Sequence, residues 1–392
     1  MKVLSLFDGI SCARVALERA GIPVEAYYAS EIDKYAIQVS QKNYPDILHI
    51  GSVIGVSCNS FCKDHYRQGH PQKINTHSCT ANIDLLIGGS PCQDLSIAKK
   101  DRKGLDGERS GLFWEYVRIL REVKPKYFIL ENVASMPKEA KEIITRELGV
   151  EPIMINASLV SAQNRKRLFW TNIPNVTQPE DRGILLKDIL ENNVDEKYKL
   201  KNINFIKGGI GKKNDLQFIG GIRNKDWAKD GKDYSRNFGQ GDRVYSPEGK
   251  STTLSALGGG RGAKTGLYAV KKEIILGDEP LQVLKEGRTE EGKKSRNEIR
   301  EKTGKDSTLR SAKHKAYFGR EGKKSNCLTT GLGMEGNIVE DFTIRKLTPI
   351  ECERLQGLPD NYTEGISNTQ RYKCLGNAFN VDVVAHILSF IK

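Results

Sequence analysis

The feature that most constrains the fold is an alternation of short apolar runs with amphipathic stretches between residue 1 and about residue 171. This alternation is typical of β-α units wound around a parallel sheet. It predicts strands at residues 2–7, 26–31, 83–88, 126–131, 152–157 and 168–171, and helices at residues 12–20, 33–43, 111–123 and 138–148. Residues 348–356 and 381–390 return to helical spacing. The sequence therefore predicts an α/β domain that is interrupted by an insert and then resumed.

The interruption is a basic, glycine-rich block. Residues 201–330 hold 29 basic and 16 acidic side chains, a surplus that equals the net charge of +13 of all 392 residues. The same block holds 20 of the 38 glycines, which is typical of short strands joined by turns. Positive charge concentrated in one segment favours a surface for a polyanion such as nucleic acid. A solvated, partly disordered insert would have the same composition, so charge alone leaves both interpretations open.

Composition argues against several classes of protein. No apolar run approaches the roughly 18 residues of a membrane-spanning helix, and Asp8 interrupts the first apolar stretch, which argues against a signal peptide. The 8 cysteines are too dispersed for a secreted disulfide scaffold, so we expect reduced thiols. The sequence therefore predicts a soluble, cytoplasmic protein with no membrane partner.

A cysteine stands at the centre of the residues that could carry chemistry. Pro91-Cys92-Gln93 follows a predicted strand and the turn Gly88-Gly89-Ser90, and ligands of such sheets bind beyond the carboxyl ends of the strands. A thiolate there would be a strong nucleophile, whereas a lone cysteine after a strand is more often a small buried apolar residue. Glu131-Asn132-Val133 ends another strand, and Gln163-x-Arg165-x-Arg167 precedes a third. A thiol, a carboxyl group and two guanidinium groups would thus meet at one rim.

These residues are part of an ordered set of motifs that resembles the cytosine-5 DNA methyltransferases. The set consists of Ser5-Leu-Phe7-Asp-Gly9, Glu31, Pro91-Cys92-Gln93, Glu131-Asn132-Val133, Gln163-x-Arg165-x-Arg167, Leu347-Thr348-Pro349 with Arg354-Leu-Gln356-Gly357-Leu-Pro359, and Gly376-Asn377-Ala378. Any one short motif is weak evidence, but this many in order are specific. The resemblance covers about residues 1–175 and 343–392. The catalytic motifs are similar to the vertebrate de novo branch, within an architecture of prokaryotic or phage type.

The resemblance implies a fold and a domain organisation. The fold would be the Rossmann-like α/β fold of S-adenosylmethionine-dependent methyltransferases, a mixed sheet flanked by helices, with a smaller, irregular, β-rich target-recognition domain. Residues 1–175 would form the catalytic and cofactor-binding domain. Residues 176–342 would form the basic target-recognition domain, and residues 343–392 would return to the catalytic domain.

The resemblance also implies an activity, the transfer of a methyl group to carbon 5 of a cytosine flipped out of a specific double-stranded DNA sequence. Cys92 would add at carbon 6 and so make carbon 5 nucleophilic. Glu131 would hydrogen-bond ring N3. Arg167 would contact the base carbonyl oxygen, and Arg165 would support the base, the backbone or the adduct. The basic loop at residues 94–110 would close over DNA.

The implied cofactor is S-adenosylmethionine, which leaves as S-adenosylhomocysteine. The contacts predicted for it are Phe7, Asp8, Gly9, Ile10, Ser11, Glu31, Ile32, Pro91, Leu112, Asn377 and Ala378. The loop at residues 8–11 lacks the glycine pattern of a dinucleotide site, which fits a ligand without a pyrophosphate. Gly51 is followed by Ser52, where the family often has an acid that contacts adenine.

The expected partner is double-stranded DNA, bound by a monomer, with a restriction endonuclease as a possible companion. Two alternatives are the same chemistry on RNA cytosine and a catalytically inactive DNA-binding protein on this scaffold. The long basic insert favours DNA, because it suits readout of the major groove. The presence of Cys92, Glu131 and Arg167 together favours an enzyme.

Residues 57–80 form an insertion relative to the family that is rich in cysteine and histidine. Cys58-x3-Cys62 with His77-x-Cys79 could make a four-coordinate zinc site. The spacing is unusual, however, and a plain polar loop is the better interpretation. No metal site is therefore predicted.

Overall fold

The computed structural model describes residues 1–57, 82–91, 110–201, 203–213, 215–223, 238–256, 261–262, 264–271, 283–288, 301, 315–320 and 342–391. The chain divides into two compact units. One unit is Met1–Val270 with Ile344–Lys392, and the other is Lys271–Thr343. The second unit contains an antiparallel hairpin of β12 (Val283–Arg288) and β13 (Lys315–Arg320).

The first unit is built on a seven-stranded sheet of order β3-β2-β1-β4-β5-β7-β6. Its strands are β1 (Lys2–Leu6), β2 (Ala26–Ser30), β3 (Leu48–Gly51), β4 (Leu85–Gly88), β5 (Tyr127–Val133), β6 (Ile153–Asn156) and β7 (Lys166–Thr171). β1 to β5 pair in parallel, whereas β7 is antiparallel to both β5 and β6. The predicted mixed sheet is confirmed, and β3 is a strand that the sequence did not predict.

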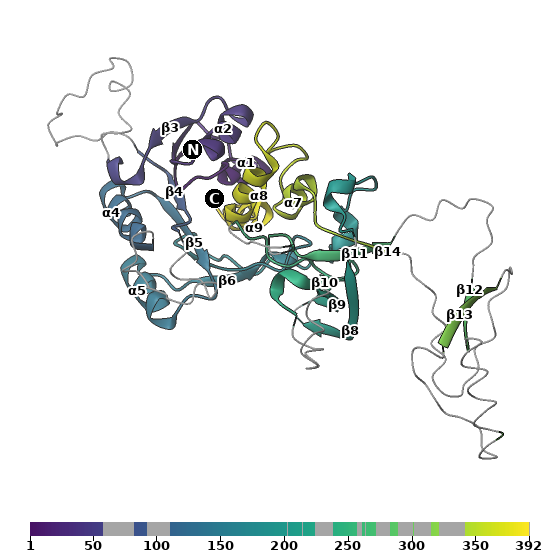
Figure 1. The fold of residues 1–392 in the computed structure, drawn as a ribbon. Coiled ribbons are helices and arrows are strands. Elements are labelled where there is room, and N and C mark those ends of the chain that lie inside the picture. The colour runs from purple at the N-terminus through teal and green to yellow at the C-terminus, as the bar shows by residue number, and fades with distance from the viewer. Residues whose placement is uncertain are drawn as a thin grey trace. The chain divides into compact units, whose positions relative to one another are not determined.

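Helices cover both faces of this sheet (Figure 1). One hydrophobic core joins Val3, Ala29 and Ile129 of the strands to α1 (Cys12–Arg19), α2 (Lys34–Asn43) and α9 (Val381–Leu388). The other core joins Leu4, Leu6 and Leu130 to α4 (Phe113–Val123) and α5 (Lys138–Leu148). Successive side chains of a strand point to opposite faces, so a strand covered on both faces must be apolar throughout. This explains the nearly uninterrupted apolar runs that predicted the strands.

The C-terminal segment returns to the sheet as α7 (Pro349–Leu355), α8 (Asn368–Asn377) and α9. α7 begins with a capping box in which Thr348 accepts from the Glu351 N–H and Glu351 accepts from the Thr348 N–H, with Pro349 in the first turn. Helical spacing predicted α7 and α9. It did not predict α8, whose sequence is polar and contains Gly376.

A second sheet of five strands has the order β14-β11-β10-β9-β8, and four of its strands, β8 to β11, lie in the basic block. The strands are β8 (Asn204–Lys213), β9 (Leu216–Arg223), β10 (Arg243–Tyr245), β11 (Leu267–Lys271) and β14 (Phe342–Arg345). Buried Tyr245, Leu254 and Tyr268 of this region belong to the same core as α1 and α9. The strands that the composition predicted are therefore present, and their sheet shares a core with the α/β sheet.

Short 3₁₀ helices complete the described structure at Val53–Gly55, Ser110–Leu112, Ala157–Leu159, Leu186–Ile189, Glu196–Tyr198 and Gln240–Asp242. Among the described helices, none has the length and apolar character needed to cross a membrane.

Candidate active site

The candidate site lies at one edge of the seven-stranded sheet. The carboxyl ends of the parallel strands β1, β2, β4 and β5 meet at this edge. β7 runs the opposite way, with Arg167 opposite Val133 and Phe169 opposite Glu131, so its amino end lies at the same edge. Motifs far apart in the sequence are therefore brought together by strand direction.

The loop after β1 is held in an unusual backbone conformation. Phe7, Gly9 and Ser11 all have positive φ angles, of 57°, 62° and 60°. The Gly9 N–H donates to Glu31 Oε2 at 2.8 Å. Glu31 Oε1 accepts from the Ile32 and Asp33 N–H groups at 2.7 and 2.8 Å. Glu31 is therefore fixed through both carboxylate oxygens and joins the loops that follow β1 and β2.

Asp8 holds the same loop from inside the protein. Its carboxyl group is buried and accepts from the Tyr27 hydroxyl at 2.6 Å and the Ser11 hydroxyl at 2.5 Å. Burial raises the pKa of Asp8 to about 6, because the charged form loses its hydration. Ser11 continues the network to Ser40, whose Oγ lies 2.6 Å away. The Asp8 side chain thus faces the core beneath the loop.

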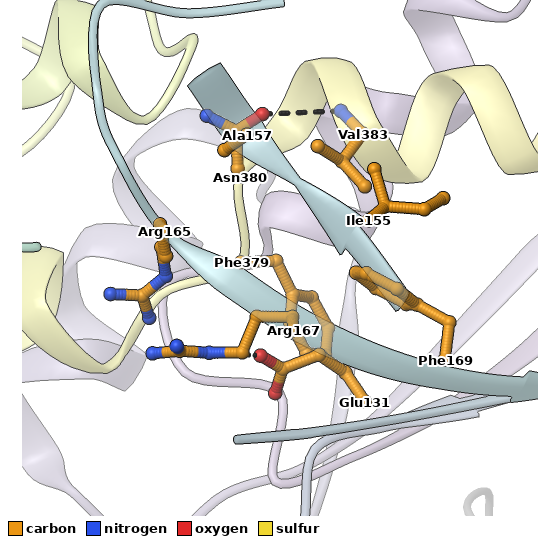
Figure 2. Close-up of a pocket in the computed structure, with 9 residues that line it drawn as sticks. All are labelled: Glu131, Ile155, Ala157, Arg165, Arg167, Phe169, Phe379, Asn380 and Val383. Atoms are coloured by element: carbon orange, nitrogen blue, oxygen red, sulfur yellow. Dashed lines mark hydrogen bonds and ion pairs between the residues drawn. The ribbon is translucent and has the colours of Figure 1, made fainter. Parts of the chain in front are cut away.

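Glu131 and Arg167 form an ion pair on neighbouring strands. Arg167 Nε lies 2.7 Å from Glu131 Oε1, and the two side chains are only 16% and 15% exposed. Figure 2 shows the carboxylate and the guanidinium group side by side next to the ring of Phe379. The structure therefore pairs two of the four residues predicted to be catalytic, and a third, Arg165, lines the same pocket.

Arg165 lies close by in sequence but makes a different set of contacts. Its side chain is buried at 4% exposure and donates to the main-chain carbonyls of Leu254, Gly376 and Ala378 at 3.4, 3.2 and 3.0 Å. These acceptors come from the basic block and from the α8 end. Arg165 thus ties three distant segments of the chain together.

The turn after β4 packs tightly against this site. Asn132 Nδ2 donates to the main-chain and side-chain oxygens of Ser90 at 3.3 and 3.1 Å. A Cβ on Gly89 would lie 2.8 Å from Phe379 Cε1 and 3.1 Å from Glu131 Oε2, so only glycine fits. The turn leads to Pro91. Cys92 and the basic loop at residues 94–109 lie outside the described residues.

A small pocket lies beside the Glu131–Arg167 pair (Figure 2). Its lining consists of Glu131, Ile155, Ala157, Arg165, Arg167, Phe169, Phe379, Asn380 and Val383. The sequence did not single out Phe379 or Asn380. Their position directly after Gly376-Asn377-Ala378 could have indicated them, because residues next in sequence to a motif that lies at the site are themselves near the site.

The other predicted cofactor contacts occupy different environments. Ile10 is buried, and its carbonyl accepts from the Tyr362 hydroxyl at 2.8 Å. Ile32 is 75% exposed beyond β2. Leu112 precedes α4, and Asn377 is exposed where α8 ends, next to buried Ala378. Leu112 is partly buried and packs against the same hydrophobic core as Phe7 of the β1 loop.

The described cysteines are poor nucleophiles. Cys12, Cys352 and Cys374 are buried free thiols, and burial raises the pKa of each, to about 12 for Cys374. A thiol with a raised pKa is almost wholly protonated at neutral pH. Within the described part of the chain no cluster of residues could hold a metal ion. The cysteine- and histidine-rich segment at residues 58–80 lies outside it.

Comparison with known proteins decides the family. A family model described as C-5 cytosine-specific DNA methylase matches residues 1–392. The chain belongs to this family. The methylase is 28% identical to the orphan methyltransferase M.Rho11sI of Bacillus phage rho11s, covering 99% of this chain and 97% of that protein. It is 25% identical to the type II methyltransferase M.HhaI of Haemophilus parahaemolyticus, covering 99% and 93%. The protein is an enzyme, a DNA (cytosine-5-)-methyltransferase.

Solved structures show the same fold. The methyltransferase EhMeth of Entamoeba histolytica superimposes with a TM-score of 0.59 at 15% identity, covering 100% of the methylase and 97% of that chain. A putative DNA modification methyltransferase encoded within an Escherichia coli prophage gives 0.54 at 18% identity, covering 100% and 98%. The predicted fold class is confirmed, and family and fold together imply S-adenosylmethionine as the methyl donor.

The residues present fit this cofactor. Both oxygens of Glu31 are fixed by N–H groups, and a carboxylate oxygen so held still has a lone pair for a ribose hydroxyl. Ile32 and Ile54 follow neighbouring strands and are 75% and 69% exposed, which offers apolar contact to a flat base. The segments that follow β2 and β3 therefore have the polar and apolar groups that an adenosine-containing cofactor needs.

Proposed function

We propose that the methylase transfers a methyl group to carbon 5 of a cytosine flipped out of double-stranded DNA, through a transient bond between Cys92 Sγ and carbon 6. The observation that carries the proposal is the Glu131–Arg167 pair beside the glycine turn that leads to Cys92. A carboxyl group and a guanidinium group at the same small site match ring N3 and the neighbouring carbonyl oxygen of a cytosine.

Each residue has one role in this proposal. The Cys92 thiolate adds to carbon 6, and the electron pair of the ring moves toward carbon 5. Glu131 donates a proton to N3 or shares one with it, which stabilises the negative charge of the ring. Arg167 donates to the base carbonyl oxygen. After carbon 5 has accepted the methyl group, its proton passes to water acting as base. The electrons of that C–H bond re-form the C5–C6 double bond, and the C6–S bond breaks to release the thiolate.

We further propose that S-adenosylmethionine is held by Phe7–Ser11, Glu31 and Ile32, with Pro91, Leu112, Asn377 and Ala378 around it. The cofactor supplies an electrophilic methyl group. Glu31 accepts from the ribose hydroxyls, and the buried Asp8 network keeps the β1 loop in its left-handed backbone conformation. Asn132 holds the Ser90 turn, which comes directly before Pro91.

The basic block supports double-stranded DNA as the substrate. Residues 176–342 are proposed as the target-recognition domain, and the surplus of Lys and Arg lies within them. Neutralising phosphates releases counterions and drives binding without regard to sequence. A base inside a duplex cannot reach a thiol, so the target nucleotide has to be extruded, at a cost of a few kcal/mol. The monomeric state and the companion endonuclease stay predictions.

Cys92→Ser tests the nucleophile. DNA that contains 5-fluorocytosine should form a stable adduct with the native protein, because fluorine replaces the proton that carbon 5 must lose. Cys92→Ser should form no adduct and transfer no methyl groups, while its affinity for S-adenosylmethionine stays within about twofold, since a hydroxyl is a far weaker nucleophile. Cys352→Ala is the matched control, because it removes a buried thiol and should leave the adduct intact.

Two outcomes would contradict the proposal. An adduct that maps to another residue would remove Cys92 from its role. Methyl groups found on RNA and not on DNA, in parallel reactions read by bisulfite sequencing, would support the RNA alternative. On DNA, the same sequencing reports both that cytosines have been methylated and which sequence positions they occupy.

A further inference from the structure

Lys250 is a buried cation without a carboxylate partner among the described residues. It follows β10 within the basic block and is only 4% exposed. Its Nζ donates to three main-chain carbonyls, those of Ser158, Ser161 and Ile184, at 2.7, 3.4 and 2.6 Å. An ammonium group has three N–H donors, so these carbonyls use all of them. Burial lowers the pKa of Lys250, because its charged form is desolvated.

The hydrogen bonds of this buried charge all go to carbonyls, and the more distant carboxylates of Asp181, Asp215 and Asp188 offset only part of the lost hydration, since the pKa of Lys250 is lowered on balance. The effective penalty for burying an ion is several kcal/mol, and an apolar side chain of similar length would avoid it. An apolar side chain cannot form directional hydrogen bonds, whereas the N–H groups of Lys250 fix the positions of the three carbonyl groups. Two of the three belong to residues 158–161, which lead directly to the Gln163-x-Arg165-x-Arg167 motif.

The residues after Lys250 form further hydrogen bonds with this motif. The Ser251 N–H donates to the Ala162 carbonyl at 2.6 Å, and the Asn164 N–H donates to the Ser251 carbonyl at 2.9 Å. Thr253 Oγ1 donates to the Asn164 carbonyl at 2.5 Å. Arg165 then donates to the Leu254 carbonyl. Residues 250–254 thus hold residues 158–165 at successive points, and we name them the clamp.

Gln163 shows what depends on the clamp. Its side chain is fully buried, and neither its amide oxygen nor its amide nitrogen has a hydrogen-bond partner among the described residues. No hydrogen bond holds this amide, whereas the main chain on either side of Gln163 is held by Ser251, which fixes the position of the Gln163 backbone. Arg167, two residues after Arg165, is placed by the same stretch and reaches Glu131.

The clamp also contacts the five-stranded sheet that contains β8 and β9. The Lys250 N–H donates to the Asp215 carbonyl at 2.9 Å, at the turn between β8 and β9. A Cβ on Gly249 would lie 2.7 Å from that same carbonyl oxygen, so the two turns are packed as closely as glycine allows. One lysine therefore joins the turn of the proposed DNA-reading sheet to the loop of the proposed catalytic arginine.

We propose that Lys250 is a positioning residue for methyl transfer, which holds residues 158–164 so that Gln163 and Arg167 are correctly placed. The proposal rests on the proposed function for its catalytic consequence and on the contacts of Lys250 for its structural one. It gives the basic block a second task besides DNA binding, because part of the block completes the catalytic centre.

The test compares Lys250→Met with Lys187→Met in the full-length protein. Lys187 lies in the same corner but is exposed and pairs with Glu248 at 2.6 Å. Lys250→Met should lower kcat roughly 10- to 100-fold, because small misplacements at a catalytic centre have effects of this size. The KM values for DNA and for S-adenosylmethionine should change less than about threefold if substrate and cofactor binding are left intact. Lys187→Met should leave all three parameters within about twofold, as expected for a surface ion pair.

Amide hydrogen exchange of the DNA-free protein supplies a second readout. Residues 158–164 should exchange at least about tenfold faster in Lys250→Met than in Lys187→Met, because the clamp stabilises them against local opening. Should Lys250→Met not fold, Thr253→Val removes one side-chain contact of the clamp and should lower kcat several-fold with the same local change in exchange.

Three results would overturn the proposal. The first is a native kcat in Lys250→Met, or in Thr253→Val if Lys250→Met does not fold. The second is a reduced kcat with unchanged amide exchange at residues 158–164. The third is a raised KM with an unchanged kcat. If the native protein itself transfers no methyl groups, the proposed function fails. Faster exchange in Lys250→Met would then still establish the clamp as a structural contact, so the two failures are distinguishable.

Discussion

Replacing Arg165 and Arg167 one at a time by lysine should separate two arginines that the sequence presents as a pair. Arg165 is 4% exposed and donates to three main-chain carbonyls from the basic block and the α8 end. Arg167 is 16% exposed and pairs with Glu131. Arg165→Lys should therefore lower stability and activity together, whereas Arg167→Lys should lower activity with little change in stability.

The magnitudes follow from the contacts. A lysine at position 165 has a shorter, unforked end and can keep about one of the three carbonyls, and each lost hydrogen bond from a charged group costs about 1.5–3 kcal/mol. Arg165→Lys should thus destabilise by about 3–6 kcal/mol. At about 2 °C per kcal/mol for a chain of this size, the Tm should fall by about 6–12 °C. A lysine at position 167 keeps its charge beside Glu131, so the change should stay near 1 kcal/mol.

Calorimetry and transfer of labelled methyl groups to DNA measure the two effects. The transfer assay is run well below the Tm of the weaker variant, so that unfolding does not lower the rate. Arg167→Lys should reduce kcat roughly 100-fold or more, as for the loss of a donor to developing charge. A native Tm in Arg165→Lys would refute the reasoning, because the buried carbonyls would then not depend on the guanidinium group.

Two further predictions concern the β1 loop and α8. In the folded protein the pKa of Asp8 is raised to about 6 from 3.8, so its contribution to stability is full below about pH 4 and is lost as the pH rises through 6. In urea unfolding, the difference in the free energy of unfolding between the native protein and Asp8→Asn should fall by about 1 kcal/mol between pH 5 and 7. A difference that stays constant with pH would contradict the assignment. Gly376→Ala places a Cβ 2.3 Å from the Ala256 main-chain nitrogen, so the free energy of unfolding should fall by about 1–3 kcal/mol. In the control Gly55→Ala no described atom lies within 4 Å of the added carbon, so the free energy of unfolding should change by less than about 1 kcal/mol. Equal effects of the two substitutions would argue against close packing at Gly376.

Much of the sheet could be predicted from the sequence because its strands are covered on both faces. Such strands are apolar throughout, and each predicted apolar run is a strand with bounds shifted by a few residues. β3 and α8 were missed for the opposite reason. β3 is partly exposed at the sheet edge, and α8 is polar, so neither has the apolar pattern on which such predictions depend.

The candidate site was predictable in part. Glu131 and Arg167 carry motifs, and the structure places them 2.7 Å apart. Phe379 was missed because an aromatic residue after a motif is ordinarily part of the core. Lys250 was missed because one lysine among the many of a basic block resembles the rest, and its burial becomes visible only after the block has folded against residues 158–161.

The order of the motifs by itself determined the family, the α/β class and the residue types available for chemistry, since these depend on local pattern and residue identity. The tertiary structure alone decided which of those residues meet. β7 runs antiparallel to β5, and this direction places Arg167 beside Glu131. Burial then gave two basic residues a structural task, because Arg165 and Lys250 spend their N–H groups on main-chain carbonyls. Strand direction and burial are properties of the packed chain, and no local stretch of sequence contains them.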